Sequence, residues 1–178
     1  MANDFLIRPA SLKDVPVILH QRRAMFFEMG KKHRVGLNDM TRAGKVYLSK
    51  NLAHGSYKGW LAVTHDGKIV AGGGVGISSW PPVPGYPHPR RATIYNVYTE
   101  PGHRRRGLAR KLMLVMMEWC WKRGFATVYL HASNDGRPLY DSLGFEPTNE
   151  MRLSLKSATW KRNHLRVPGN NRGAAGPH

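Results

Sequence analysis

The apolar residues near the start of the chain recur at helical spacing. A helix is predicted over residues 12–29, because one of its faces would collect the apolar residues Val15, Ile18, Leu19, Met25 and Phe26. Gly30 can end this helix, and Ser11 and Asp14 have the spacing of a helix-start box. We expect a short strand over residues 5–8 before it and a second helix over about residues 38–53.

Segments rich in β-branched and aromatic residues predict the first strands after these helices. Residues 57–64 and 68–79 flank His65-Asp66-Gly67, and an Asp-Gly turn between two such segments is typical of an antiparallel hairpin. The Gly-rich run 72–76 opens no helix, so we interpret it as a strand or bulge and not as a dinucleotide loop. Five prolines between residues 80 and 89 exclude a central strand there and predict a rigid loop.

The second half of the chain completes the predicted fold. The pattern favours, in order, a strand over 91–99, a helix over about 107–123, a strand over 127–132, a short helix over 136–143 and a strand over 145–155. This order predicts a mixed α/β (α+β) domain. We expect one domain over residues 1–155, followed by a loose basic tail over residues 156–178.

The cysteine and histidine content excludes several kinds of site. Cys120 is the single cysteine of the 178 residues, so no internal disulfide forms, and its place on an apolar stripe predicts a buried side chain. The nine histidines have no close pairs at the helical spacing of metal ligands, so we expect no metal. The first residues carry no long apolar run, so we expect no signal peptide, no membrane partner and a cytoplasmic location.

The charge balance is strongly basic. Lys and Arg number 28 against 11 Asp and Glu, which gives a net charge of +17 that attracts anions in general. A basic nucleic-acid-binding protein and a protein that binds a phosphorylated cofactor both fit this charge. The sequence contains no recognisable helix-turn-helix or RNP motif, so we expect no nucleic-acid partner.

The most informative segment joins the strand over 91–99 to the following helix. It reads Arg104-Arg105-Arg106-Gly107-Leu108-Ala109, a basic turn that leads into a helix start. The first N–H groups of a helix have no intrahelical partner, and its positive dipole end favours an anion. Small residues at Gly107 and Ala109 let a ligand approach the backbone, and the arginines add charge-assisted hydrogen bonds. A pyrophosphate suits such a site.

The spacing Arg104-x-x-Gly107-x-Ala109 resembles the pyrophosphate loop of the GCN5-related N-acetyltransferases. Downstream, Leu130-His131-Ala132-Ser133-Asn134 and then Tyr140-Asp141-Ser142-Leu143-Gly144-Phe145 are similar to the later motif of that family. The opening Ile7-Arg8-Pro9-Ala10 is also similar, so the likeness covers about residues 5–155. Arg105 departs from the pattern, because many members have Gly at this position.

The resemblance implies a fold, an activity and a cofactor site. It implies a central mixed sheet of about six to seven strands flanked by about four helices, with parallel strands that splay apart at the cofactor. The implied activity is transfer of the acetyl group of acetyl-CoA to an amine. The backbone of Val97 and Tyr98 would pair with the pantetheine arm, and the amides from Arg104 to Ala109 would hold the pyrophosphate. Asn134 would bond to the cofactor arm, and Tyr140 would protonate the departing thiolate.

Direct transfer in a ternary complex is expected, because no nucleophilic dyad is visible. The base that accepts the proton of the amine is not assigned to one group. By residue type and position the candidates are Glu28, Glu100, His131 and Glu150, and a water chain could replace any of them. A non-catalytic CoA-binding regulator with the same fold is an alternative. The acceptor is open among small amines, amino acids, antibiotics and protein amines, and the positive charge favours one with acidic groups.

A second apolar stripe lies on the helix over residues 107–123. It consists of Leu114, Met117 and Trp121, beside the stripe that contains Cys120. Burial of these residues needs either another element of the fold or a partner subunit, and a homodimer is the second of these alternatives.

Overall fold

The computed structural model describes residues 5–30 and 34–155. The basic tail predicted over residues 156–178 therefore lies outside the described residues. The chain divides into two units, Met1–Leu143 and Gly144–His178, and the helices and strands named below all belong to the first.

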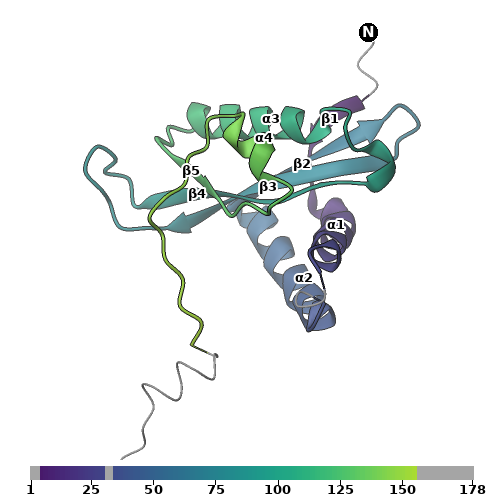
Figure 1. The fold of residues 1–178 in the computed structure, drawn as a ribbon, viewed down its shortest axis with the longest axis horizontal. Helices are drawn as coiled ribbons and strands as arrows, with labels where there is room; N and C mark the ends of the chain where they lie inside the picture. The colour runs from purple at the N-terminus through teal and green to yellow at the C-terminus, as the bar shows by residue number, and fades with distance from the viewer. Residues whose placement is uncertain (1–4, 31–33, 156–178) are drawn as a thin grey trace, which may run out of the picture. The chain divides into compact units, whose positions relative to one another are not determined.

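The first unit is a mixed α/β layer structure (Figure 1). Helices α1 and α2 lie on one face of its sheet, and α3 and α4 lie on the other. In chain order its elements are β1 (Phe5–Pro9), the 3₁₀ turn η1 (Leu12–Asp14), α1 (Val15–Glu28), α2 (Leu37–His54), β2 (Tyr57–Thr64), β3 (Ile69–Ser79), β4 (Arg90–Thr99), the 3₁₀ turn η3 (Pro101–His103), α3 (Leu108–Lys122), β5 (Val128–Leu130) and α4 (Arg137–Asp141).

The sheet has the strand order β1-β2-β3-β4-β5. The first four strands pair in an antiparallel manner, and β5 pairs parallel to β4. The parallel pairing begins with Ala92 opposite Val128 and ends with Ile94 opposite Leu130, whereas β4 continues to Thr99. The residues of β4 beyond Ile94 therefore have no partner in β5. This confirms the expectation that two parallel strands, β4 and β5, separate at one end.

The glycine run in β3 allows helices to approach the sheet from both faces. A Cβ atom on Gly72 would lie 2.4 Å from the side-chain oxygen of Gln21 in α1. A Cβ atom on Gly73 would lie 3.0 Å from the terminal methyl of Met116 in α3. The strand register shifts between Gly72 and Gly74, so the interpretation of this run as a Gly-rich strand with a bulge is confirmed.

Apolar side chains fill the space between the sheet and the helices on both faces. The core on the α1 and α2 face includes Val15, Ile18, Leu19, Leu48, Tyr57 and Leu61. On the α3 face the predicted buried position of Cys120 is confirmed, since its side chain is fully buried. Burial raises the pKa of the Cys120 thiol to about 11, so this group is an inert part of the core at neutral pH.

An ion pair fixes the start of α1 to β1. The guanidinium of Arg8 donates two hydrogen bonds to the carboxylate of Asp14, at 3.0 and 2.7 Å. The backbone N–H of Ser11 donates to the same carboxylate at 2.7 Å, which confirms the helix-start box. The bond from Arg8 is the main reason why the pKa of Asp14 falls to about 2.

The strand predicted over residues 145–155 is wrong. This segment belongs to the second unit and forms no strand, so the described residues contain five strands and not the six to seven expected. Pro147 has no N–H to donate to a sheet, and Thr148 and Asn149 favour turns. The large apolar residues near the end of this segment are exposed: Met151, Leu153 and Leu155.

Candidate functional site

The turn between β4 and α3, called the cradle below, has the backbone features of an anion-binding turn. Arg105 and Gly107 both adopt left-handed backbone conformations, with φ of 62° and 75°. Among the described residues, no backbone acceptor is bonded to the N–H groups of Arg105, Arg106 or Gly107, and the first turn of α3 adds further unpaired donors. A Cβ atom on Gly107 would meet nothing within 4 Å, so the space beside this turn is open. Turns of this kind bind anions through their backbone.

The left-handed conformation of Arg105 explains why glycine is common at this position in the family. Glycine reaches positive φ without steric cost, whereas a side chain there costs about 1 kcal/mol. The side chain of Arg105 is exposed, so it leaves the backbone donors of the turn accessible.

Arg104 is engaged within the protein. Its Nη2 donates to the Oε2 of Glu28 at 2.6 Å, and its Nε donates to the carbonyl of Thr99 at 2.9 Å. Its own N–H donates to the carbonyl of Pro101 at 3.3 Å. The donors that remain for a ligand therefore begin at Arg105, and the guanidinium of Arg104 holds the loop against the end of α1.

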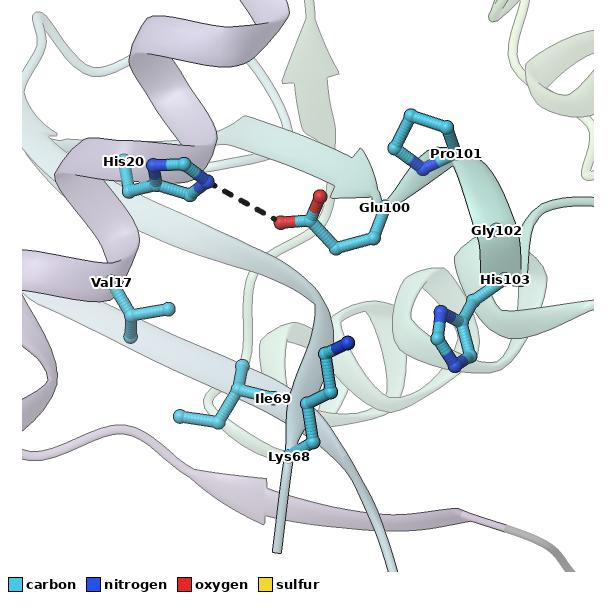
Figure 2. Close-up of a pocket in the computed structure, with 8 residues that line it drawn as sticks. All are labelled: Val17, His20, Lys68, Ile69, Glu100, Pro101, Gly102 and His103. Carbon is cyan, nitrogen blue, oxygen red and sulfur yellow. Dashed lines mark ion pairs between the residues drawn. The ribbon is translucent and has the colours of Figure 1, made fainter.

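Glu100 lies on the other side of this loop, in a hollow of about 450 Å³ (Figure 2). Its carboxylate points toward His20 of α1, with 3.7 Å between Oε1 and Nε2. The lining residues come from α1, from the start of β3 and from the turn after β4: Val17, His20, Lys68, Ile69, Glu100, Pro101, Gly102 and His103. A strand rises about 3.3 Å per residue, so Glu100 stands roughly 20 Å along the chain from Ile94, where β4 and β5 part.

Two residues of β4 point their polar groups toward α1. The hydroxyl of Tyr98 donates to the Oε1 of Glu28 at 3.0 Å, and burial together with this bond raises the pKa of Tyr98 to about 12. Asn96 has a left-handed φ of 59° at the bulge and is buried. Its side-chain amide donates to the hydroxyl of Tyr57 at 3.1 Å and accepts a hydrogen bond from Arg22. Asn96, Tyr57 and Arg22 are not among the site residues predicted from the sequence.

The remaining predicted residues of the first unit follow β5. His131 comes directly after Leu130, the last β5 residue paired with β4, and both His131 and Asn134 are exposed. Tyr140 lies in α4 and is half-buried, and burial raises the pKa of its phenol. The hydroxyl of Ser142 accepts a hydrogen bond at 2.9 Å from Arg110 in the first turn of α3, so α4 lies beside the cradle. Glu150 belongs to the second unit and is exposed.

Comparison with known proteins decides the family. The family model described as "Acetyltransferase (GNAT) family" matches residues 27–145, more than half of the chain. The chain belongs to this family. The N-acetyltransferase YjgM of Escherichia coli, itself uncharacterized, is 29% identical over 148 residues, which cover 79% of this chain and 81% of that protein.

Solved structures agree with the family assignment. A GCN5-related N-acetyltransferase from Ralstonia eutropha is 36% identical, with a TM-score of 0.79 over 84% of this acetyltransferase and 97% of that chain. An acetyltransferase from Clostridium acetobutylicum, solved with acetyl-CoA, is 26% identical, with a TM-score of 0.78 over 85% of this chain and 96% of that one. The protein is therefore an acyltransferase with the GNAT fold that uses acetyl-CoA as co-substrate and acts on an amine.

A third relative matches a shorter stretch. The ribosomal-protein-bS18-alanine N-acetyltransferase of Escherichia coli is 42% identical over 57 residues, which cover 30% of this acetyltransferase and 38% of that enzyme. Within residues 5–30 and 34–155, no three His, Cys, Asp or Glu side chains are grouped as metal ligands. No helix in the same ranges is long and apolar enough to span a membrane.

Proposed function

We propose that this acetyltransferase passes the acetyl group directly from acetyl-CoA to a primary amine within a ternary complex. The observation that carries the proposal is the cradle at Arg105–Gly107, which adjoins the edge of β4 that β5 leaves unpaired. The cradle is suited to the pyrophosphate, and the unpaired edge is suited to the amides of the pantetheine arm.

The cofactor would follow β4 toward the point where the strands part. In this proposal the backbone of Val97 and Tyr98 pairs with the pantetheine arm, because both residues lie beyond the last pair with β5. The amides from Arg105 to Ala109 hold the pyrophosphate, and Leu108 and Ala109 contribute as the first residues of α3. Asn134, exposed in the loop after β5, bonds to the cofactor arm from the opposite side.

Tyr140 is the proposed acid that protonates the departing thiolate. Its half-buried position raises the pKa of the phenol above the ordinary value near 10, so the group carries its proton at neutral pH. The helix that bears it lies beside the first turn of α3, through the bond between Arg110 and Ser142. A proton donor at this position lowers the barrier to departure of the thiolate.

His131 is the base that the geometry favours among the four candidates. It stands directly after the last β4–β5 pair, where an amine would meet the thioester. Glu28 bonds to Tyr98 and Arg104, so we assign it a positioning role. Glu100 faces His20 at the far end of the unpaired part of β4, away from the point where β4 and β5 separate. Glu150 stays a candidate by residue type alone, and it is exposed in the second unit.

The proposed role of Tyr140 can be tested by its replacement with Phe. We expect Tyr140→Phe to lower kcat about 100-fold in a thiol-release assay with a panel of amines, while acetyl-CoA binding is retained. Tyr86→Phe in the proline-rich loop is the matched control and should leave kcat unchanged. A Tyr140→Phe enzyme with full activity would contradict the role, and a wild-type protein that binds acetyl-CoA but acetylates no amine would contradict the proposed function.

The homodimer stays a prediction. Leu114 and Trp121 of the second apolar stripe of α3 are exposed, at 49% and 74% of their surface. Light scattering of the purified protein measures the oligomeric state directly.

A further inference from the structure

Arg22 of α1 is a cation held inside the first unit, on the face of the sheet covered by α1 and α2. Its side chain is partly buried, and burial lowers the pKa of its guanidinium. It donates a hydrogen bond to the side-chain oxygen of Asn96 and lies 5.0 Å from the ring centre of Phe26. These contacts fix the guanidinium next to the bulge of β4.

Three tyrosines lie near this guanidinium, and Tyr57 bonds to the same Asn96 side chain as Arg22. Tyr47, Tyr57 and Tyr95 are all close enough to interact with Arg22 electrostatically. A Cβ atom on Gly76 would lie 2.8 Å from the ring of Tyr95 and 3.6 Å from the hydroxyl of Tyr47, so these two side chains meet above β3. Tyr47 comes from α2 and Tyr95 from β4, and both are exposed in part, at 48% and 38%.

Within the part of the chain that the structure describes, the charge of Arg22 has no counter-ion. No carboxylate of the described residues bonds to Arg22, and the ion pairs in that part of the chain join Asp14, Glu28, Asp39, Glu100 and Glu118 to other cations. The shell around Arg22 consists of a neutral amide, an aromatic ring and neutral phenols. A cation that is withdrawn from water in this way ordinarily has an anionic partner.

The cluster also lies where an acceptor would enter. Asn96, which binds Arg22, is two residues beyond Ile94, the last β4 residue paired with β5. An acceptor amine must reach the thioester at this separation of the strands if the proposed function holds. An anionic group of the acceptor that binds Arg22 would then be close to the reacting amine. The two groups would belong to the same small molecule or to the same end of a peptide chain.

We propose that Arg22, with the hydroxyl groups of Tyr47 and Tyr95, binds a carboxylate of the acceptor, so that the enzyme acetylates amines that carry a carboxylate close by. This inference rests on the proposed function. A carboxylate matches the planar donors of a guanidinium and carries the single negative charge that one cation balances. A phosphate would bring close to two negative charges, and the groups that contact Arg22 in residues 5–30 and 34–155 include no second cation.

The experiment compares three classes of amine in one acetylation assay with acetyl-CoA. The classes are α-amino acids and dipeptides, the amides of the same compounds, and phosphorylated amines such as phosphoethanolamine. For the wild-type enzyme, we expect kcat/KM to be about 10- to 100-fold higher for the carboxylates than for their amides. Arg22→Gln should abolish this preference, and Arg22→Lys should retain part of it.

Arg23→Gln is the matched control, because Arg23 is the next residue of α1 and is exposed, with a 3.0 Å hydrogen bond to Asn38. It removes the same charge and should keep the preference for carboxylates. Calorimetric binding of acetyl-CoA to Arg22→Gln should equal that of the wild type, which shows that the variant is folded and its cofactor site intact.

Several results would overturn the inference while the proposed function stands. These are amine acetylation with no preference for a carboxylate, a preference for the phosphorylated amines, or an Arg22→Gln enzyme that still prefers carboxylates. An enzyme that binds acetyl-CoA and acetylates only amines without a carboxylate would overturn it too. A wild-type protein that neither binds acetyl-CoA nor acetylates any amine fails at the earlier step, and the inference falls with the proposed function.

Discussion

The carboxylate of Glu28, the last residue of α1, lies 2.6 Å from the guanidinium of Arg104 in the turn before α3. The same carboxylate accepts a hydrogen bond of 3.0 Å from the hydroxyl of Tyr98. One side chain thus joins α1, the end of β4 that β5 leaves unpaired and the turn proposed to bind the cofactor. The geometry of the cradle therefore depends on a helix that covers the opposite face of the sheet from α3 (Figure 1).

Replacement of Glu28 by Gln should weaken cofactor binding. The pair is about two-fifths exposed on both sides, so its loss is worth about 0.5–1 kcal/mol and should raise the Kd of acetyl-CoA roughly two- to fivefold. Titration calorimetry at low and high salt measures this, and the difference should shrink at high salt. Glu118→Gln, which breaks an exposed pair with Lys122 on α3, is the control and should leave the Kd unchanged. Equal affinities of the wild type and Glu28→Gln at low salt would show that the pair does not support the cradle.

Replacement of Arg105 by Gly should stabilise the protein. Arg105 has a φ of 62°, where glycine avoids a steric cost of about 1 kcal/mol, and a net gain of about 0.5 kcal/mol should remain after the added freedom of the unfolded chain. The urea midpoint measures the change. Arg106→Gly removes the same charge at a residue without positive φ and should lower the midpoint. A lower midpoint for Arg105→Gly would refute the strain at this residue.

The sequence was sufficient for the parts of the fold that depend on local patterns. The Asp-Gly turn, the glycine run and the apolar spacing of α1 and α3 each reflect a local constraint, and the corresponding hairpin, strand and helices are present. The prediction of a strand over 145–155 failed because a strand needs a pairing partner as well as strand-like composition, and Met151, Leu153 and Leu155 are exposed in a segment without strand structure.

The turn before α3 depends on a local pattern, whereas the Arg22 cluster depends on residues that are distant in sequence. The turn before α3 is continuous in sequence, so its spacing was enough to predict it as a cofactor site, whereas Arg22, Tyr47, Tyr57 and Asn96 come from four separate elements. A signal for the cluster did exist. Arg22 falls four residues after the buried Ile18 on the same helical face, and Asn96 interrupts an apolar strand. Polar residues on a core-facing stripe indicate a partner or a ligand.

The stability of the fold should depend on pH through Asp14. Its folded pKa of about 2 is below the unfolded value of 3.8, so its contribution of about 2 kcal/mol is present above pH 4 and is lost as the pH falls toward 2. Asp14→Asn should therefore lower the free energy of unfolding at pH 7 and differ little from the wild type near pH 2. Urea unfolding across this range tests it, with the exposed Asp39→Asn as control. A deficit of Asp14→Asn that stays constant with pH would contradict the assignment.

The proposed base predicts a defect in catalysis alone. His131→Gln should lower kcat by about 100-fold while the Kd of acetyl-CoA remains that of the wild type. His65→Gln, in the turn between β2 and β3, is the control and should have no effect. Steady-state kinetics with a saturating amine, together with calorimetry, separates the two quantities. If kcat of His131→Gln is unchanged, a water chain or another residue accepts the proton.

The cradle itself is tested most directly by the affinity for acetyl-CoA of Gly107→Leu compared with Gly124→Leu. The two glycines flank the ends of α3, have φ of 75° and 74°, and each has open space where a Cβ would be placed. Both substitutions therefore carry the same backbone strain, and only the first places a side chain in the cradle. We expect Gly107→Leu to weaken binding at least tenfold and Gly124→Leu to leave it unchanged. Equal affinities of these two variants and the wild type would contradict a pyrophosphate site at the start of α3.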